Sequence, residues 1–320
     1  MNYNLLLENL TNPALLFFGL GILSVYLKSD LEIPANSSKF ISLYLLFAIG
    51  FKGGQELSHE TFTSEIGWSM LFGIFISLII PLYTFFILKK KLNVFDSGAI
   101  AAAYGSVSAV TFVTAVSYLE TQQLTLHGHM VAIMALMESP AIIIGLLLIS
   151  IFNKEATDKI KKRTVLNHSF TNGSVLLILG SLLIGFVANA KQAEGIKPFT
   201  NDLFKGFLAI FLLDMGITSG RKLKAFFSFG WFPLLFAMII PLMNGSIIAM
   251  LSSLVTHDIT NRFIFAILAA SASYIAVPAA MQISAPKANP GLFLPMALAV
   301  TFPINITIGM PVYFLIVQNT

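Results

Sequence analysis

Long apolar runs separated by short polar or charged clusters make up most of the chain. A helix needs about 20 mostly apolar residues to cross the hydrocarbon core of a bilayer. The polar clusters divide the chain into ten predicted membrane-spanning helices, at residues 13–28, 39–54, 66–88, 97–119, 129–152, 174–190, 201–218, 229–254, 261–284 and 290–317. We therefore predict an all-α membrane protein with ten transmembrane helices.

Composition agrees with this prediction, because 56% of the residues are hydrophobic, 11% are charged, and the mean hydropathy is +0.83. Such a chain has too few polar residues to cover a water-facing surface. The formal net charge is +4. We assign the basic residues to loops, where they set the orientation of the protein in the bilayer, so the positive charge does not imply a nucleic-acid partner. The expected partner is a lipid bilayer. The absence of Cys excludes thiolate metal sites, and the five His lack ligand spacing. We expect no metal centre and no cofactor.

The distribution of Lys and Arg predicts how the chain is oriented. If all ten helices cross, alternate loops share a side, and 14 of the 19 Lys and Arg fall on one side. The other side receives Lys52, Lys191, Lys197, Lys205 and Arg262. Because loops rich in Lys and Arg stay in the cytoplasm, we predict a multi-pass protein of the cell inner (plasma) membrane with both termini outside the cytoplasm.

The two halves of the chain resemble each other. Gly50 and Gly54 in AIGFKGGQEL match Gly216 and Gly220 in DMGITSGRKL. Other landmarks recur in the same order: Gly-Trp at 67–68 and 230–231, IIPL at 79–82 and 239–242, AIAAAYGSVSAV over AILAASASYIAV at 99–110 and 266–277, and MAL at 134–136 and 296–298. We infer a five-helix repeat at 1–153, a cytoplasmic linker at 154–172 and a second five-helix repeat at 173–320. Because each repeat has an odd number of helices, the second is inverted, as is typical of secondary transporters.

Two apolar runs contain small and hydroxyl residues at matching positions of the repeats, AAAYGSVSAV (101–110) and AASASYIAVP (269–278). We predict that crossover helix 4 is interrupted around Tyr104–Ser106 and crossover helix 9 around Ser271–Tyr274. Each break frees backbone N–H groups at the positive end of a second half-helix, which attracts an anion. The hydroxyls within reach are those of Ser106, Ser108, Thr111, Ser271 and Ser273. The alternative is that these small residues only permit close helix packing.

A carboxylate lies in the middle of the fifth predicted helix, in Glu138-Ser139-Pro140, and the tenth helix has Thr301-Phe302-Pro303 at the matching position. A carboxylate at this depth is costly unless it pairs, binds an ion or relays protons. The prolines free backbone carbonyls that suit a hard cation such as Na⁺. The candidate sodium-binding residues are Glu138, Ser108, Thr301 and Asn305. The alternative for Glu138 is a protonated side chain hydrogen-bonded within the bundle.

Asp214 lies near the end of the seventh predicted helix. An ion pair with Lys52 or Lys205, or a position at the membrane interface, explains this carboxylate at least as well as an ion site does. The Gly-x3-Gly pairs of the second and seventh helices are expected to let these helices pack closely.

Several stretches resemble the sodium-dependent bicarbonate transporter family of photosynthetic bacteria, over about Asn12–Val317. They are NPALLFFGLGIL, LLFAIGFKGGQEL, YGSVSAVTFVTA, MALMESPAI, LFKGFLAIFLLDMGITSG, AASASYIAVPAAMQISAPKANPGL and VTFPINITIGMPVYF. The resemblance implies a homotrimer in which helices 1, 2, 6 and 7 form a static gate, and helices 3–5 and 8–10 form a mobile core that carries bicarbonate and Na⁺.

The two crossover motifs carry this resemblance residue by residue. The matching residues are Gly105, Val107, Ser108 and Thr111 in the first motif, and Ala270, Ser271, Ser273, Ile275 and Pro278 in the second. The candidate substrate-binding residues are therefore Gly105, Ser106, Val107, Ser108, Thr111, Ser271, Ser273 and Tyr274.

The chain departs from the family pattern at four core positions. It has Tyr274 where the family has Asp, Ala276 where it has Ser, Val277 where it has Gly, and Glu138 where it has Asp. The loop at 153–172 is also much shorter than in members regulated by a PII-like signalling protein, so the resemblance does not carry that partner over.

These features predict a secondary active transporter that brings bicarbonate into the cell by Na⁺-coupled symport, with an elevator-like core moving against the gate. The alternative on the same fold is a Na⁺- or H⁺-coupled symporter or exchanger of another small organic anion. An intramembrane aspartyl protease would need two converging carboxylates, and Glu138 and Asp214 are not at equivalent repeat positions. Nothing resembles the filter motif or charged ring of a channel. We expect no enzymatic activity.

Overall fold

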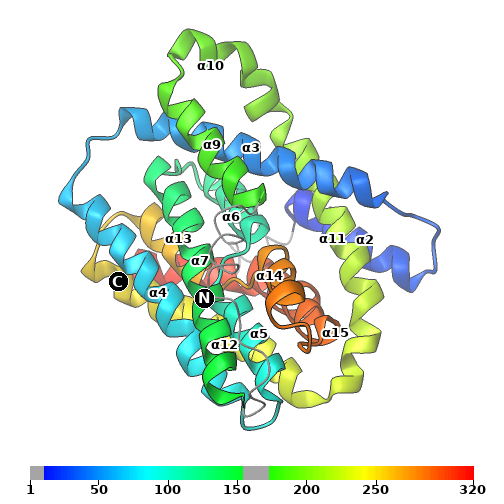
Figure 1. Ribbon diagram of the computed structural model, residues 1–320. Helices are drawn as coiled ribbons and strands as arrows, with labels where there is room; N and C mark the ends of the chain where they lie inside the picture. Colours follow the sequence, from blue (N-terminus) through cyan, green and yellow to red (C-terminus); the bar gives the residue numbers. More distant parts are fainter. Residues whose placement is uncertain (1–10, 154–172) are drawn as a thin grey trace.

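The computed structural model describes residues 11–153 and 173–320, and every regular element in these two ranges is a helix (Figure 1). The predicted linker at 154–172 lies outside the described residues. The elements of the first range are α2 (Pro13–Tyr26), α3 (Ala35–His59), α4 (Ser64–Leu88), α5 (Val94–Gly105), α6 (Ala109–Thr121) and α7 (Gly128–Phe152). Those of the second are α9 (Gly173–Val187), α10 (Ala190–Lys197), η1 (Pro198–Asp202), α11 (Phe204–Phe226), η2 (Phe227–Phe229), α12 (Trp231–Leu251), η3 (Ser252–Leu254), α13 (Ile259–Ala270), α14 (Ala276–Ser284), α15 (Pro290–Pro295), η4 (Met296–Thr301), α16 (Phe302–Ile304), η5 (Asn305–Gly309) and α17 (Met310–Asn319).

Within residues 11–153 and 173–320, six stretches of helix are long and apolar enough to cross a membrane. They are Ser64–Leu88, Val94–Thr121, Gly128–Phe152, Ala190–Leu223, Trp231–Leu254 and Pro290–Asn319. Shorter apolar helices occupy Leu15–Tyr26, Leu176–Val187 and Ile259–Ala270. The predicted all-α membrane protein is confirmed at this level, and the crossing of all ten helices remains a prediction.

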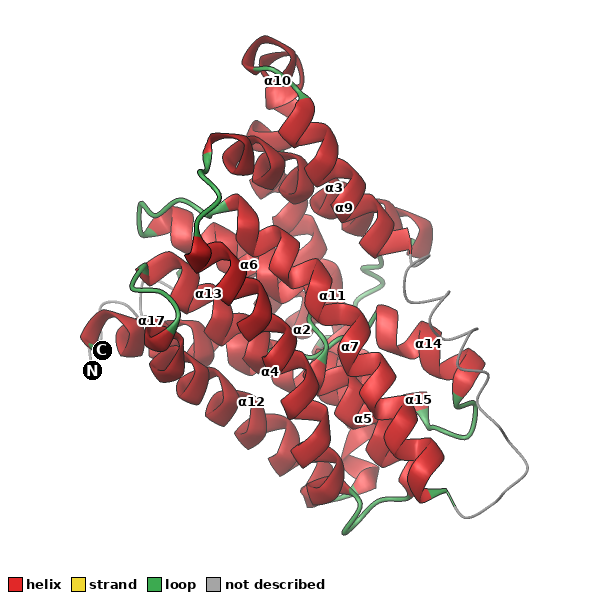
Figure 2. Cartoon of the chain, turned by 60° about the vertical axis from the view of Figure 1, so that its left-hand side comes forward, coloured by secondary structure: helices red, strands yellow, loops and turns green. Residues whose placement is uncertain are grey.

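Two helix pairs flank the rest of the molecule, α3 with α9 and α2 with α11. Figures 1 and 2 show α9 lying along α3, and α10 projecting beyond them at one end. A side chain at Gly54 would overlap the backbone oxygen of Leu182 in α9, and one at Gly216 would overlap that of Phe18 in α2. The prediction that glycines let these helices pack closely is confirmed.

The remaining helices bury α5 and α13 almost completely. α4, α5 and α7 pack on one another, and α12, α13 and α17 form a second such group. All residues from Asp96 to Gly105 and from Thr260 to Ala270 are buried. The helix breaks that follow Gly105 and Ala270 therefore lie inside the protein.

A cluster of His and acidic side chains ties α3 to α7 and α13 at one end of the molecule. Glu60, at the end of α3, accepts hydrogen bonds from the backbone N–H of Gly128 at 2.7 Å and lies 2.7 Å from His129 Nδ1. The His127 ring stands between two carboxylates, with Nδ1 3.6 Å from Glu60 Oε1 and Nε2 3.5 Å from Asp258 Oδ2.

These contacts shift the pKa values of His127 and Asp258. Hydrogen bonding to Asp258 and the negative charges of Asp258, Glu60 and Glu56 raise the pKa of His127 above its ordinary value, although burial opposes the shift. Burial alone would raise the pKa of Asp258, but hydrogen bonds from His127 and from the Asn261 backbone lower it overall. Both shifts favour a charged pair that joins the loop before α7 to the start of α13.

We predict that this pair stabilises the fold more in mild acid than in base. A histidine pKa raised on folding contributes stability that is complete below the unfolded value near 6.5 and is lost as the pH rises through the folded value. His127→Gln should therefore lower the thermal unfolding midpoint at about pH 5.5 more than at about pH 8.5. Replacement of the exposed His59 by Gln is the control. Equal losses for His127→Gln at both pH values would contradict the assignment.

Candidate functional site

The first break separates α5 from α6 at Ser106, Val107 and Ser108. Ser106 and Ser108 adopt extended backbone conformations, and the Ser108 side chain accepts a hydrogen bond from the backbone N–H of Thr111 at 3.2 Å. This is an N-cap, for which Ser is a favoured residue. Gly105, a poor helix former, ends α5. The helix stops and restarts here because local residue preferences favour both events.

The second break separates α13 from α14 at residues 271–275. Ser273 Oγ accepts a hydrogen bond from the Val277 backbone N–H at 3.5 Å. Pro278 is the third residue of α14, where the absence of an N–H costs no helical hydrogen bond. Both predicted interruptions are therefore present, and the half-helices α6 and α14 begin beyond them.

The two breaks bind each other. The Ser108 backbone N–H donates to Ser271 Oγ at 3.0 Å, and the Ser273 backbone N–H donates to the Ala103 carbonyl at 2.8 Å. Ser271 Oγ donates in turn to the Leu268 carbonyl at 3.0 Å. Buried backbone groups need such partners because water is absent at this depth.

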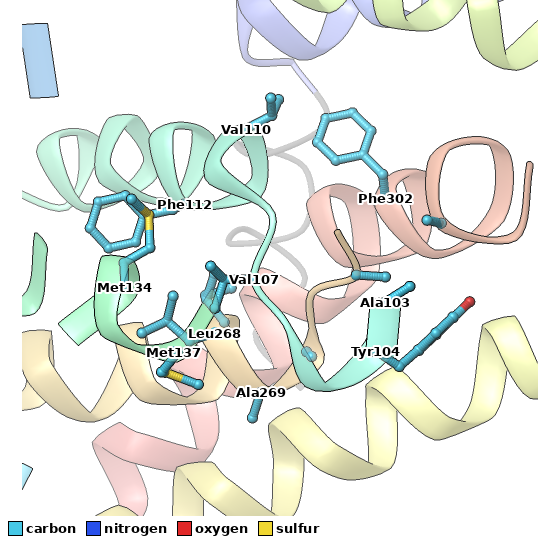
Figure 3. Packing of buried hydrophobic residues seen from close by; sticks show 14 of the residues in the cluster. Ala103, Tyr104, Val107, Val110, Phe112, Met134, Met137, Leu268, Ala269 and Phe302 are labelled. Carbon is cyan, nitrogen blue, oxygen red and sulfur yellow. The ribbon is translucent and has the colours of Figure 1, made fainter. Parts of the chain in front are cut away.

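Apolar side chains enclose the first break. Figure 3 shows Val107 on the connecting segment, with Met134 and Met137 of α7 and Leu268 of α13 close to it, and these residues belong to one buried cluster. A side chain at Gly105 would overlap the ring of Pro81 in α4. The surroundings of the break are therefore largely apolar, which strengthens any hydrogen bond or charge interaction made there.

Two hydroxyls beside the breaks have no partner in the described part of the chain. Ser106 Oγ is fully buried and makes no hydrogen bond. The buried Tyr274 hydroxyl lies near Ser108 but also makes no hydrogen bond of normal geometry within residues 11–153 and 173–320. An unpaired buried polar group costs about 1–3 kcal/mol. These two groups point to a polar ligand that completes them.

The predicted substrate-binding residues thus come together from two segments more than 160 positions apart in sequence. Gly105, Ser106, Val107, Ser108 and Thr111 lie at the first break and the first turn of α6. Ser271, Ser273 and Tyr274 lie at the second. Together the segments offer hydroxyls and two half-helix N-termini, which are suited to a small anion.

Two side chains of the last predicted span contact the helices beside the breaks, Thr301 at the end of α5 and Asn305 at the end of α13. The Tyr104 hydroxyl lies 2.7 Å from Thr301 Oγ1, which donates to the Ala237 carbonyl at 2.8 Å. Asn305 Nδ2 donates to the Ala270 carbonyl, the last of α13, at 2.7 Å. Asn305 Oδ1 accepts a hydrogen bond from the hydroxyl of Tyr313 at 3.0 Å. Tyr313 was absent from the sequence-based set because a tyrosine in an apolar run carries no pairing signal.

The last span is one continuous stretch of helix, but it is not a regular α-helix throughout. Wide helical turns occupy Met296–Thr301 and Asn305–Gly309, on either side of the short α16 that contains Pro303. Such π-type turns are frequent at functional sites. They place Thr301 and Asn305 where their side chains reach α12, α13 and α5.

Glu138 lies on α7, and no hydrogen bond or ion pair joins it to another described residue. The alternative of a side chain hydrogen-bonded within the bundle therefore finds no support among the described residues. Asp214 accepts a hydrogen bond from Ser38. The suggested pairing of Asp214 with Lys52 or Lys205 is wrong, because both lysines contact Glu120 instead.

We predict opposite effects for one substitution at two glycines. Gly105→Ala should lower the unfolding free energy by about 1–3 kcal/mol, because the added methyl group must displace the Pro81 ring. Gly67→Ala, in the same bundle but with open space around the position, should leave stability equal or raise it by up to about 1 kcal/mol. Thermal unfolding of the two purified variants measures the difference. A Gly105→Ala variant as stable as Gly67→Ala would show that the break is loosely packed.

A comparison with known protein families identifies the family of this chain. The family model of the Na⁺-dependent bicarbonate transporter superfamily matches residues 13–318, which include both breaks, Glu138, Thr301 and Asn305. No individual curated protein matches the sequence. The match confirms the resemblance expected from the motifs, and with the six long apolar stretches it indicates a multi-pass membrane transporter rather than an enzyme. The chain belongs to the Na⁺-dependent bicarbonate transporter superfamily.

Proposed function

We propose that the protein brings bicarbonate into the cell by Na⁺-coupled symport and that the crossed helix breaks bind the anion. The observation that carries this proposal is the pair of unpaired hydroxyls, Ser106 and Tyr274, beside the N-termini of α6 and α14. Bicarbonate is planar, carries one negative charge and has three oxygens. It can accept hydrogen bonds from both segments at once.

Na⁺ binds beside the anion in this proposal. Glu138 supplies a carboxylate that no described residue neutralises, and Ser108, Thr301 and Asn305 supply neutral oxygens of the kind that hard cations prefer. The positive charge lowers the cost of holding a carboxylate and an anion inside the membrane. Binding of each ion thereby favours binding of the other, which is the basis of symport.

An inverted repeat supports alternating access as the mechanism. If α2 and α3 of the first repeat correspond to α9 and α11 of the second, then exchanging the repeats converts the α3–α9 pair into the α11–α2 pair, and both pairs are present. We propose ten crossing helices, a gate formed by these four, and a core of the remaining helices that moves like an elevator. A homotrimer with both termini outside the cytoplasm completes this proposal.

Uptake of labelled bicarbonate into proteoliposomes tests the function. Uptake should rise several-fold when an inward Na⁺ gradient replaces an equal K⁺ gradient, and short organic carboxylates should compete weakly. Na⁺-driven uptake of a short carboxylate without bicarbonate uptake would favour the organic-anion alternative on the same fold.

We predict that the hydroxyls of Ser106 and Tyr274 contribute to the affinity for bicarbonate. Ser106→Ala and Tyr274→Phe remove hydroxyls that make no hydrogen bond of normal geometry within the described residues, so protein stability should not fall. Each should raise the half-saturating bicarbonate concentration about tenfold, because a hydrogen bond to a charged ligand is worth about 1.5–3 kcal/mol.

Ser69 offers a matched control for this test. Its hydroxyl is also buried without a partner in the described chain. It lies 12 residues, or about 18 Å along α4, from Pro81, the residue of α4 that contacts Gly105 at the first break. Ser69→Ala should leave the affinity unchanged. Wild-type affinity in the Ser106→Ala/Tyr274→Phe double variant would show that these hydroxyls do not contact the anion.

Removal of the Glu138 charge should uncouple Na⁺ from transport. Glu138→Gln keeps the side-chain shape, so expression and thermal stability should stay near wild type while the half-saturating Na⁺ concentration rises about tenfold or more. Glu65→Gln, at the exposed start of α4, is the control. Unchanged Na⁺ activation in Glu138→Gln would place the cation elsewhere, and Na⁺-independent, pH-driven uptake by the wild type would identify H⁺ as the coupling ion.

A further inference from the structure

A second polar site lies away from the helix breaks, at the end of the molecule where α6 stops. A cavity of about 360 Å³ opens there between α3, α6, η1 and α11. Its polar lining consists of Lys52, Glu120, Thr200, Asn201, Asp202 and Lys205. A water molecule occupies about 30 Å³ in the liquid, so the cavity has room for a small anion together with part of its hydration shell.

One carboxylate holds two lysines in this cavity. Lys52 Nζ lies 2.7 Å from Glu120 Oε1, and Lys205 Nζ lies 3.4 Å from Glu120 Oε2. Each oxygen of Glu120 therefore faces a different ammonium group. The three side chains are only partly exposed or lie at the rim, with side-chain exposures of 29% for Lys52, 26% for Glu120 and 66% for Lys205.

Lys52 and Lys205 are placed as in an anion-binding site, and the carboxylate of Glu120 takes the place of the anion. A carboxylate and a bicarbonate ion each have a planar carbon with two unprotonated oxygens, and in each the single negative charge is spread over those two oxygens. Two ammonium groups that hold the Glu120 carboxylate from either side can hold bicarbonate in the same way. Asp202 also lines the cavity, so the formal charge of the four side chains is balanced until Glu120 leaves.

The lysines and Glu120 come from different parts of the fold. Lys52 and Lys205 lie on α3 and α11, which pack against α9 and α2. Glu120 lies near the end of α6, which packs on α13 and begins at the first break. Glu120 is 12 residues from Ser108 along this helix, or about 18 Å. A movement of α6 relative to α3 and α11 would separate Glu120 from both lysines.

We propose that Lys52 and Lys205 form an outer capture site for the transported oxyanion, and that Glu120 is a tethered carboxylate that the anion displaces. Both lysines belong to the small set of basic residues on the predicted outer side. The bicarbonate identity of the cargo rests on the proposed function, whereas the anion site itself rests on the cavity and its ion pairs.

Substitutions of Glu120 and of Lys52 distinguish an anion-binding site from an ion pair that only stabilises the fold. Glu120→Gln removes the competitor and should lower the half-saturating bicarbonate concentration, while Lys52→Gln should raise it, each by about two- to fivefold for partly exposed charges. Lys197→Gln is the control, because Lys197 pairs with Glu194 on α10 outside the cavity. Shifts in the same direction for Glu120→Gln and Lys52→Gln would overturn the proposal.

A labelling experiment tests the site without transport. The chain has no Cys, so Asn201→Cys places a single thiol in the cavity wall and Leu254→Cys places one on an exposed position as control. Glu120→Gln should speed reaction of Asn201→Cys with a sulfonate-bearing methanethiosulfonate relative to a trimethylammonium-bearing one, and Lys52→Gln should slow it. Added bicarbonate should protect Asn201→Cys and not Leu254→Cys.

The two readouts fail separately. Absence of bicarbonate uptake by the wild type would contradict the proposed function, and the labelling rates would still decide whether the cavity binds anions. If uptake is present but the labelling of Asn201→Cys responds neither to bicarbonate nor to the charge of Glu120 and Lys52, the outer capture site is refuted.

Discussion

A helix that breaks inside a bilayer must have its backbone N–H and C=O groups bound within the protein, because lipid offers no partners. Here the two breaks satisfy each other, through the Ser108 N–H on Ser271 Oγ and the Ser273 N–H on the Ala103 carbonyl. Neither break is satisfied without the other. This mutual requirement explains why α5 and α13 are buried and why other helices surround their junction.

Most polar groups at the breaks have hydrogen-bond partners within the protein, and the few that have none among the described residues are available to a ligand. Asn305 binds the last carbonyl of α13, and Ser108 caps α6, so these parts of the breaks are complete. The hydroxyls of Ser106 and Tyr274 are not. A protein that keeps two buried hydroxyls unpaired loses stability, and in the proposed function the binding of a small anion offsets that loss. Membership of a bicarbonate transporter superfamily agrees with this chemistry.

The sequence predicts the breaks because Gly, Ser and Pro interrupt apolar runs at matching positions, and local preference decides where these helices stop. It does not predict side-chain partners that depend on packing, such as Glu120 for Lys52 or Tyr313 for Asn305. Hydropathy does not identify α10 because it is polar, although Asn189 and Gln192 form a capping box, which is a sequence signal for a helix start. The residues of the π-type turns on either side of α16 make contacts with α12 and α13, which hydropathy does not record.

A high-resolution cryo-EM map of the protein in lipid nanodiscs with bicarbonate and Na⁺ would show whether the crossed breaks bind the transported anion. We expect density for a planar anion within hydrogen-bond distance of Ser106 Oγ and the Tyr274 hydroxyl, facing the first turns of α6 and α14. Anion density at another place, with both hydroxyls still buried and unpaired, would contradict it.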